Sequence, residues 1–336
     1  MSTRTLALFM RAIDNQYQSL QKATFYARAH LYGFSVVEYD AGNNAESQGQ
    51  QIRECLKAPE KTRPKGLFVN PVHEVSLLPA AREAARLGIA WVTLNRSSDY
   101  VTDLRREYPR VPFFCVDPDQ RQVGRIQGQQ FRLLLPRGGD LFYIGGPAST
   151  SSARLRLAGV EIELAASSIR MVGGGGDWSV ESGFQATKGW LQGNRRYNWA
   201  ECIVGAQNDS MAMGAHNALL EEATERKRPE LMAIRITGCD GLPGYGQRFV
   251  HEKVLTSTVV IPPTTGMAVD RIALALDSGQ PPATDVSMDV RSFPALETLG
   301  TSTAEPAHPM APSRQRQGRT NAPTRGRTVK PRPRGA

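Results

Sequence analysis

Residues 66–97, GLFVNPVHEVSLLPAAREAARLGIAWVTLNRS, decide the fold of this chain, because they place two short apolar runs on either side of a longer helical segment. The runs Gly66–Asn70 and Trp91–Leu94 have the length of strands and lack the strict alternation of a half-exposed sheet. Strands that are buried on both faces of a parallel sheet have this continuous apolar character. The stretch therefore predicts a strand–helix–strand unit of an α/β protein.

The same alternation of strands and helices extends along the chain in both directions. The pattern Asp117-Pro118 is typical of a helix N-cap followed by proline, and it predicts a helix from there to about Leu135. Ten strands would make a large single sheet, and the polar turns after residues 116 and 135 favour two sheets in two lobes. The other predicted strands are Thr5–Met10, Phe34–Tyr39, Phe113–Val116, Leu141–Gly145, Ile169–Gly173, Cys202–Ala206, Ile234–Gly238 and Leu255–Ile261.

The positive charge of the chain is concentrated at its C-terminal end. The formal net charge is +9, of which +7 lies on residues 301–336 and +2 on the first 300 residues. After Leu299 this tail has one large aliphatic residue, Val329, among six prolines and seven arginines. Such a segment buries too little apolar surface to offset its ordering entropy, so we predict a disordered tail. Because no aromatic residue is interleaved for base stacking, we do not expect nucleic acid as a partner.

Motifs of the common enzymes and cofactor-binding proteins are absent from the sequence. There is no phosphate loop, no dinucleotide fingerprint after a strand, no G-x-S-x-G elbow and no H-E-x-x-H. We therefore expect no catalysis, no cofactor and no metal. Cys55, Cys115, Cys202 and Cys239 lack C-x-x-C spacing and are predicted to be buried free thiols. No apolar run predicts membrane insertion, and the N-terminus shows no secretory signal peptide.

Polar and aromatic residues follow nearly every predicted strand. Ligands of open parallel sheets bind beyond the carboxyl ends of the strands, so these are candidate binding residues. Carboxylates accept hydroxyl hydrogens, guanidiniums donate, amides do both, and flat rings cover the C–H face of a sugar. Each residue alone is also typical of a turn or a helix cap. Their recurrence after Met10, Leu94, Gly145, Gly173, Ala206 and Gly238 favours a binding protein for a polyol.

A series of short motifs in a fixed order carries a family resemblance. From Thr5 to Phe293 the chain resembles the type I periplasmic binding proteins, specifically the sugar-binding components of ABC transporters related to ribose-binding protein. The motifs are AIDNQY (12–17), YDAGNNAESQGQQI (39–52), GLFVNPV (66–72), VTLNRS (92–97), VDPDQ (116–120), TSSARLRLAGV (150–160), GDWSVESGF (176–184), AQNDSMAMGA (206–215), ITGCDG (236–241) and STVVIPPTTGM (257–267).

The resemblance implies two similar lobes, each a parallel sheet flanked by helices, joined by a three-crossing hinge near Asp117, Ile261 and Val286. It implies that a monomer closes over a monosaccharide or polyol and delivers it to an ABC transporter permease in the periplasm or cell envelope. The implied division is an N-terminal lobe of residues 1–116 and 262–286, a C-terminal lobe of residues 117–261 and 287–300, and the basic tail of residues 301–336.

The resemblance also implies a set of ligand-binding positions. Three of them depart from the usual residue types: Asn95 is neutral where an acidic residue is common, Gln18 stands where a second ring is frequent, and Ile261 replaces a polar side chain. The pocket is therefore expected to differ from a ribose pocket. The implied positions are Asn15, Tyr17, Gln18, Asn95, Arg96, Arg156, Trp178, Asn208, Asp240 and Ile261.

An alternative function shares the same fold. Lactose-repressor-type regulators use these lobes as an effector domain behind an N-terminal helix-turn-helix. This chain begins at the first predicted strand and leaves no room for such a domain. The alternative is therefore a cytoplasmic sugar sensor or regulator-like protein without a DNA-binding helix-turn-helix, with the basic tail as an arm.

Overall fold

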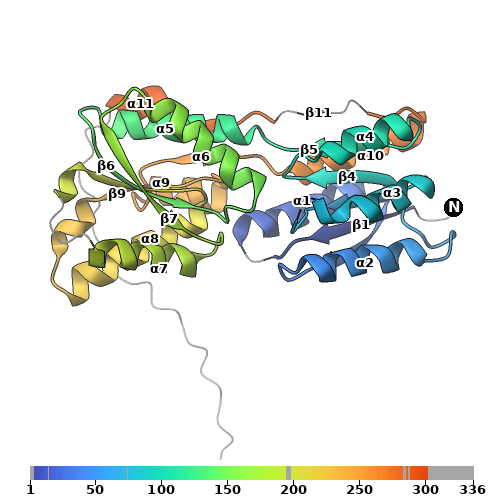
Figure 1. Cartoon of the computed structure of the whole chain (residues 1–336), viewed down its shortest axis with the longest axis horizontal. Coiled ribbons are helices and arrows are strands. Elements are labelled where there is room, and N and C mark those ends of the chain that lie inside the picture. The colour runs from blue at the N-terminus through green and yellow to red at the C-terminus, as the bar shows by residue number, and fades with distance from the viewer. Residues whose placement is uncertain are drawn as a thin grey trace, which may run out of the picture.

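The computed structural model describes residues 4–13, 15–73, 75–193, 198–282, 285–286 and 288–301. These residues form two α/β units that lie end to end in Figure 1. Each unit has a parallel sheet with helices on its faces, which confirms the predicted fold class. The predicted disordered tail lies outside the described residues, apart from Thr301.

The first unit is built on a six-stranded parallel sheet in the order β11-β5-β4-β3-β1-β2. Leu6 and Leu8 of β1 pack on one side of this sheet, and Ala7 and Phe9 pack on the other. Burial on both faces explains why the strand reads as an unbroken apolar run. The strands are β1 (Thr5–Met10), β2 (Ser35–Asp40), β3 (Gly66–Val69), β4 (Ala90–Leu94), β5 (Phe113–Val116) and β11 (Asp285–Val286), and the helices are α1 (Gln16–Leu31), α2 (Ala45–Lys57), α3 (Leu78–Arg86), α4 (Asp99–Glu107) and α10 (Thr264–Ser278).

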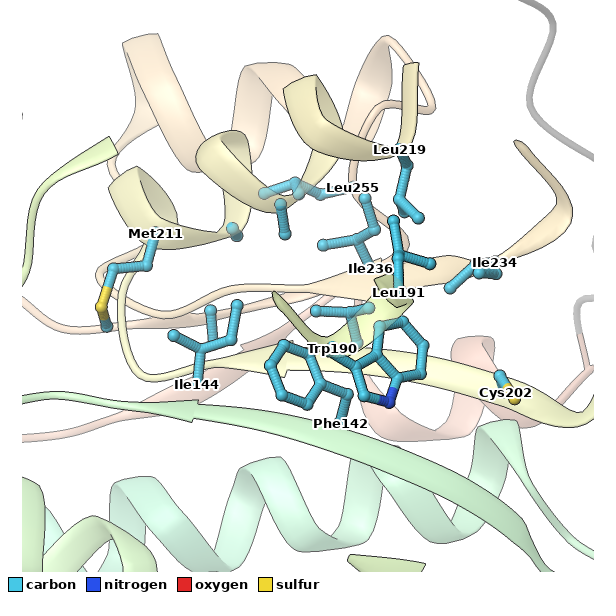
Figure 2. Close-up of a cluster of buried hydrophobic side chains, with 14 of the residues drawn as sticks. Phe142, Ile144, Trp190, Leu191, Cys202, Met211, Leu219, Ile234, Ile236 and Leu255 are labelled. Carbon is cyan, nitrogen blue, oxygen red and sulfur yellow. The ribbon is translucent and has the colours of Figure 1, made fainter. Parts of the chain in front are cut away.

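The second unit has a four-stranded parallel sheet in the order β7-β6-β8-β9. Its largest core cluster gathers Phe142, Trp190 and Met211 with other apolar side chains between the strands and α8, as Figure 2 shows. The strands are β6 (Gly139–Gly145), β7 (Ile169–Gly175), β8 (Cys202–Ala206) and β9 (Arg235–Thr237), and the helices are α5 (Gln120–Leu134), α6 (Ser151–Leu164), α7 (Val180–Gly193), α8 (Asp209–Glu225), α9 (Arg248–His251) and α11 (Leu296–Thr301).

A two-stranded antiparallel ribbon beside α5 departs from the predicted pattern. The run Leu255–Ile261 forms only the short strand β10 (Thr258–Val260), which pairs with β12 (Arg291–Phe293). Ser257, directly before β10, and Val260 within it form isolated parallel bridges to Thr237 and Asp240 at the end of the four-stranded sheet. The predicted strand is therefore confirmed for Thr258–Val260, which lies parallel to the end of β9 and the residues after it through these bridges and is also antiparallel to β12. The antiparallel partner of β10 lies 31–35 residues later in the sequence, and no periodicity identifies such a partner.

Three connections join the two units. They run through residues 117–119 between β5 and α5, through residues 261–263 between β10 and α10, and through the segment between β11 and β12. The three crossings were expected near Asp117, Ile261 and Val286, which are positions in or beside these connections. The division into two lobes that move against each other stays a prediction.

The first connection also corrects the predicted start of a helix. The N-cap of α5 is Asp119, whose side chain accepts a hydrogen bond from the backbone N–H of Gln122 at 2.9 Å. Asp117 instead accepts from Nε2 of Gln120 at 2.9 Å. The Asp-Pro pair therefore belongs to the crossing, and the helix begins two residues later than the capping pattern predicts.

Helices α5 and α6 approach each other closely at two glycines. A Cβ atom on Gly124 would lie 2.0 Å from the backbone oxygen of Arg156, and one on Gly159 would lie 2.2 Å from that of Arg121. Overpacking of this kind costs about 1–3 kcal/mol. We therefore expect Gly159→Ala to lower the free energy of unfolding, measured by urea denaturation, by an amount in this range.

Gly189 on α7 provides the matched control for that substitution. It is exposed and its Cβ position is open, with nothing within 4 Å. Alanine favours a helix interior over glycine by about 0.5–1 kcal/mol, so Gly189→Ala is expected to stabilise the protein slightly. Equal effects of the two substitutions would contradict the close helix packing.

Two further features of the structure concern the state of the four cysteines and the length and apolarity of the helices. Cys55, Cys115, Cys202 and Cys239 are all buried and free, which confirms the prediction from their spacing. Within the described ranges, no helix is both long and apolar enough to cross a membrane.

Candidate functional site

A cavity lies between the two units, and each unit contributes half of its lining residues. The volume of this cavity is about 60 Å³. Such concave sites between domains are where small ligands bind. The lining residues from the first unit are Arg11, Asn15, Tyr17, Gln18, Asn70, Asn95 and Arg96, and those from the second unit are Pro118, Gln120, Ser152, Arg156, Trp178, Asn208 and Asp240.

The structure brings nine of the ten predicted binding positions to this cavity, and the exception is Ile261. The side chain of Ile261 is 2% exposed and packs in a cluster with Tyr17. Its backbone N–H donates to the carbonyl oxygen of Asp240 at 3.0 Å, so it supports a lining residue from behind. Contact of the other nine with a ligand stays a prediction.

Five lining residues were not predicted from the sequence. Arg11 and Asn70 directly follow β1 and β3, so the rule that located the other candidates applies to them as well. Pro118 and Gln120 lie in the segment after β5, and Ser152 lies in the first turn of α6 after β6, so the strand-end rule reaches these segments without singling out these residues.

Asn95 organises the wall that follows β4. Its φ angle is 61°, in the left-handed region that asparagine adopts more readily than most residues. Its Oδ1 accepts from the Tyr17 hydroxyl at 3.2 Å, from Gln21 Nε2 at 2.7 Å and from Thr264 Oγ1 at 3.0 Å. Its Nδ2 is buried and has no hydrogen-bond partner among the described residues. The Oδ1 of Asn95 therefore links the end of β4 to α1 and α10.

The neighbouring amide side chains of Asn15, Gln18 and Asn70 also form hydrogen bonds within the protein. Asn15 caps α1, because its Oδ1 accepts from the backbone N–H of Gln18 at 3.0 Å. The Gln18 Oε1 accepts from Nδ2 of Asn70 at 2.8 Å. These bonds fix the rotamers of three lining side chains before any ligand is present.

Arg156 on α6 ties the second unit to the crossing. Its Nε donates to Oε1 of Gln120 at 2.8 Å, and its Nη1 donates to the carbonyl oxygen of Gln207 and to Sγ of Cys239. The guanidinium carbon lies 5.6 Å from the ring centre of Trp178. Arg156 is 7% exposed, so its charge is held in a largely water-free wall.

Trp178 packs in the hydrophobic core of the second unit and also lines the cavity. Its φ angle is 78°, and its ring lies so close to Gly146 that a Cβ atom there would be 2.2 Å from the ring. Asn208 holds this loop, because its Nδ2 donates to the Trp178 carbonyl oxygen at 2.9 Å while its Oδ1 caps α8. Both ends of the Asn208 amide are thereby used within the protein.

Among the described residues, Asp240 is the one carboxylate that lines the cavity. Burial raises its pKa from 3.8 to about 7, against the opposing effects of the Arg156 and Arg11 guanidiniums. Its neighbour Asp209 is also buried, and burial together with the charge of Asp240 raises the pKa of that carboxyl. Asp209 is satisfied internally by the Thr258 hydroxyl at 2.7 Å and the Gly241 N–H at 2.8 Å.

The arrangement is suited to binding rather than to catalysis. Rings from both units, a carboxylate and several fixed donors surround one small space, as recognition of a hydroxylated ring requires. The described residues include no group of three or more potential ligands that could hold a metal ion.

Comparison with known proteins gives consistent similarities. A family model for the periplasmic binding protein domain matches residues 6–280. The D-ribose/D-allose-binding protein of Pseudomonas aeruginosa is 24% identical over 283 residues, which cover 82% of this chain and 83% of that protein.

Solved structures share the fold at lower sequence identity. A solute-binding protein of an ABC transporter from Actinobacillus succinogenes, with bound D-allose, gives a TM-score of 0.74 at 18% identity, covering 88% of this chain and 99% of that one. One from Bacillus halodurans with bound myo-inositol gives a TM-score of 0.73 at 19% identity, covering 89% and 97%.

Proposed function

This chain belongs to the periplasmic binding protein domain family, and on that basis we propose that it is the solute-binding component of a bacterial ABC transporter for a monosaccharide or polyol. The observation that carries the proposal is the cavity between the two units, which has Tyr17 from one unit and Trp178 from the other. Members of this family bind their solutes and do not transform them.

The cavity offers each kind of contact that a sugar needs. The rings of Tyr17 and Trp178 cover C–H faces, and the Asp240 carboxylate accepts hydroxyl hydrogens. Arg156 and Asn95 donate to hydroxyl or ring oxygens. The D-ribose/D-allose-binding relative and the structures with D-allose and myo-inositol support a solute of this size and kind.

The family name places its members in the periplasm, and we assign this chain to the periplasm or cell envelope on that ground. Its macromolecular partner is then an ABC transporter permease, which recognises the loaded form. We assign the arrangement described here to that loaded form, because the lining residues Tyr17, Arg156 and Asp240 are each less than a tenth exposed.

Binding is tested first by thermal shift against pentoses, hexoses, polyols and their acids, followed by calorimetry on the best compound. A solute that binds only the folded state raises the melting temperature, and above Kd this rise grows with the logarithm of the solute concentration. We expect at least one compound of this panel to do so. If none of them shifts the melting temperature or gives heat, the proposed function is wrong.

Closure gives an independent prediction. If the units rotate about the three connections, the ligand-free protein is more open than the arrangement described here. Saturation with the solute should then lower the radius of gyration measured by small-angle scattering. An unchanged radius at saturation would exclude a hinge at residues 117–119 and 261–263.

A further inference from the structure

Gln207 lies directly behind the cavity wall of the second unit and is not among the described lining residues. It follows β8 and is 1% exposed, and its backbone N–H donates to the carbonyl oxygen of Ile144 on β6 at 3.0 Å. An unpaired polar group is costly in such a buried position, so a buried amide is normally bonded at both ends. The bonds of the Gln207 side chain therefore show which segments it holds in place.

Both ends of the Gln207 amide bond to the segment that follows β6. Its Oε1 accepts from the backbone N–H of Gly146 at 2.9 Å, and its Nε2 donates to the carbonyl oxygen of Ala153 at 3.0 Å. Gly146 is the first residue after β6, and Ala153 lies in the first turn of α6. One side chain thus fixes the start of this loop and the start of the helix after it against the end of β8.

The helix that Gln207 holds carries Arg156. Ala153 and Arg156 are three residues apart in α6, so they lie on the same face of the helix. The Nη1 of Arg156 donates to the main-chain carbonyl oxygen of Gln207 itself. The bond from Nε2 to Ala153 therefore sets the separation of α6 and β8 at which the guanidinium reaches this carbonyl. Arg156 lines the cavity, so a shift of α6 would redirect its guanidinium there.

The loop that Gln207 holds supports Trp178. A Cβ atom on Gly146 would lie 2.2 Å from the Trp178 ring, so the ring rests directly on the backbone of this glycine. The next residue, Asn208, donates from Nδ2 to the Trp178 carbonyl oxygen at 2.9 Å. Gln207 therefore holds the surface under the ring, and Asn208 holds the backbone from which the ring extends.

We propose that Gln207 is a positioning residue of the solute site, which acts through Arg156 and Trp178 and does not touch the solute. This inference rests on the proposed function and adds a determinant of affinity to it. A site binds more tightly when its contact groups are already held in the productive geometry before the ligand arrives. All of the bonds described here lie within the second unit, so they do not depend on closure of the two units.

The test of affinity compares two buried glutamines by calorimetry on the full chain. Gln207→Met removes both amide bonds and keeps the length of the side chain, so the best-binding solute should bind about ten-fold more weakly or worse. Gln130→Met is the matched control, because Gln130 is also buried and its Nε2 donates to the Thr258 carbonyl oxygen at 3.1 Å and to Ser292 Oγ at 2.9 Å, neither of which belongs to a described lining residue. It should lower the free energy of unfolding but leave the affinity within about two-fold.

The Nε–H group of Arg156 reports the position of the guanidinium in the absence of any solute. It donates to Oε1 of Gln120 at 2.8 Å in a buried wall, so its NMR signal should be protected from exchange with water. Arg156→Lys assigns the signal by removing it. In Gln207→Met the signal should shift and exchange faster, whereas in Gln130→Met it should stay as in the wild type. A general loss of stability would affect both variants alike.

Gln207→Asn is the second variant if Gln207→Met does not fold, because it keeps a buried amide that is too short to bond both Gly146 and Ala153. The same two changes are expected from it. The proposal is overturned if the folded variant binds the solute as tightly as the wild type, if Gln130→Met weakens binding equally, or if the Arg156 signal is unchanged. If no solute binds the wild type, the proposed function fails, whereas the NMR comparison still decides whether Gln207 positions Arg156.

Discussion

Asp240→Asn is expected to weaken solute binding by about ten-fold, because it replaces a charged acceptor by a neutral amide. Bonds to charged groups contribute about 1.5–3 kcal/mol against about 0.5–1.5 kcal/mol for neutral ones, and about 1.4 kcal/mol corresponds to a factor of ten. Asparagine also tolerates the positive φ of this position, 103°, so the backbone is preserved. Calorimetric titration of the best-binding solute measures the effect.

The same substitution is expected to stabilise the ligand-free protein at pH 8. Burial holds the pKa of Asp240 at about 7, whereas the ordinary value is 3.8. Between these values the folded protein keeps a proton that the unfolded chain has released, so the wild type loses stability as pH rises from about 4 to about 7. The loss is then complete and does not grow above pH 7.

Urea denaturation at pH 4, 6 and 8 distinguishes this outcome. The variant should exceed the wild type in free energy of unfolding at pH 8, and the difference should shrink towards pH 4. Removal of the Asp240 charge also lowers the pKa of the buried Asp209, which acts in the same direction. A difference that is constant with pH, or a variant that is less stable than the wild type at pH 8, would show that the buried Asp240 carboxylate does not lower the free energy of unfolding.

Trp178→Ala should have the largest effect on stability. Trp178 is 9% exposed and belongs to the main core cluster of the second unit, with Met211 and Ile144. Truncation of a large buried aromatic residue costs about 3–5 kcal/mol. The variant should also bind solute at least ten-fold more weakly, because one face of the ring lines the cavity. Unfolding and calorimetric titration measure the two losses separately.

A double-mutant cycle with Gly146 isolates the ring contact. Gly146→Ala would place its Cβ atom 2.2 Å from the Trp178 ring, so it should destabilise the protein and weaken binding while the ring is still present. In the Trp178→Ala background the same change meets no ring and should cost little. Additive effects of the two substitutions would contradict the contact.

The sequence predicts the parallel strands well, because each is an apolar run that the sheet buries on both faces. Thr5–Met10, Phe113–Val116 and Cys202–Ala206 are strands with those bounds. The run Leu255–Ile261 forms a shorter strand than predicted, Thr258–Val260, and its antiparallel partner β12 was not predicted, because β12 lies far along the chain and local pattern does not specify pairing. The start of α5 at Gln120 depends on the side-chain bond to Asp119, which competes with the equally plausible cap at Asp117.

The sequence predicts which residues line the site better than it predicts which of their atoms remain available to a ligand. The strand-end rule locates Asn95 and Asp240, and it would also have located Arg11. It does not show which atoms of a side chain the protein already uses. The Asn208 side chain bonds the Trp178 carbonyl oxygen and caps α8, and of the Asn95 amide only Nδ2 is left without a partner among the described residues. The sequence does not show this, because Trp178 and the partners of the Asn95 Oδ1 are distant in sequence.

The central claim is that a sugar or polyol binds between the two units. A crystal structure of the full chain with its best-binding solute tests this most directly. The account predicts the solute between Tyr17 and Trp178, with a hydroxyl within hydrogen-bond distance of Asp240 and an oxygen within reach of Arg156. A solute bound elsewhere, such as in the hollow beside Trp199 and Arg228, would contradict it.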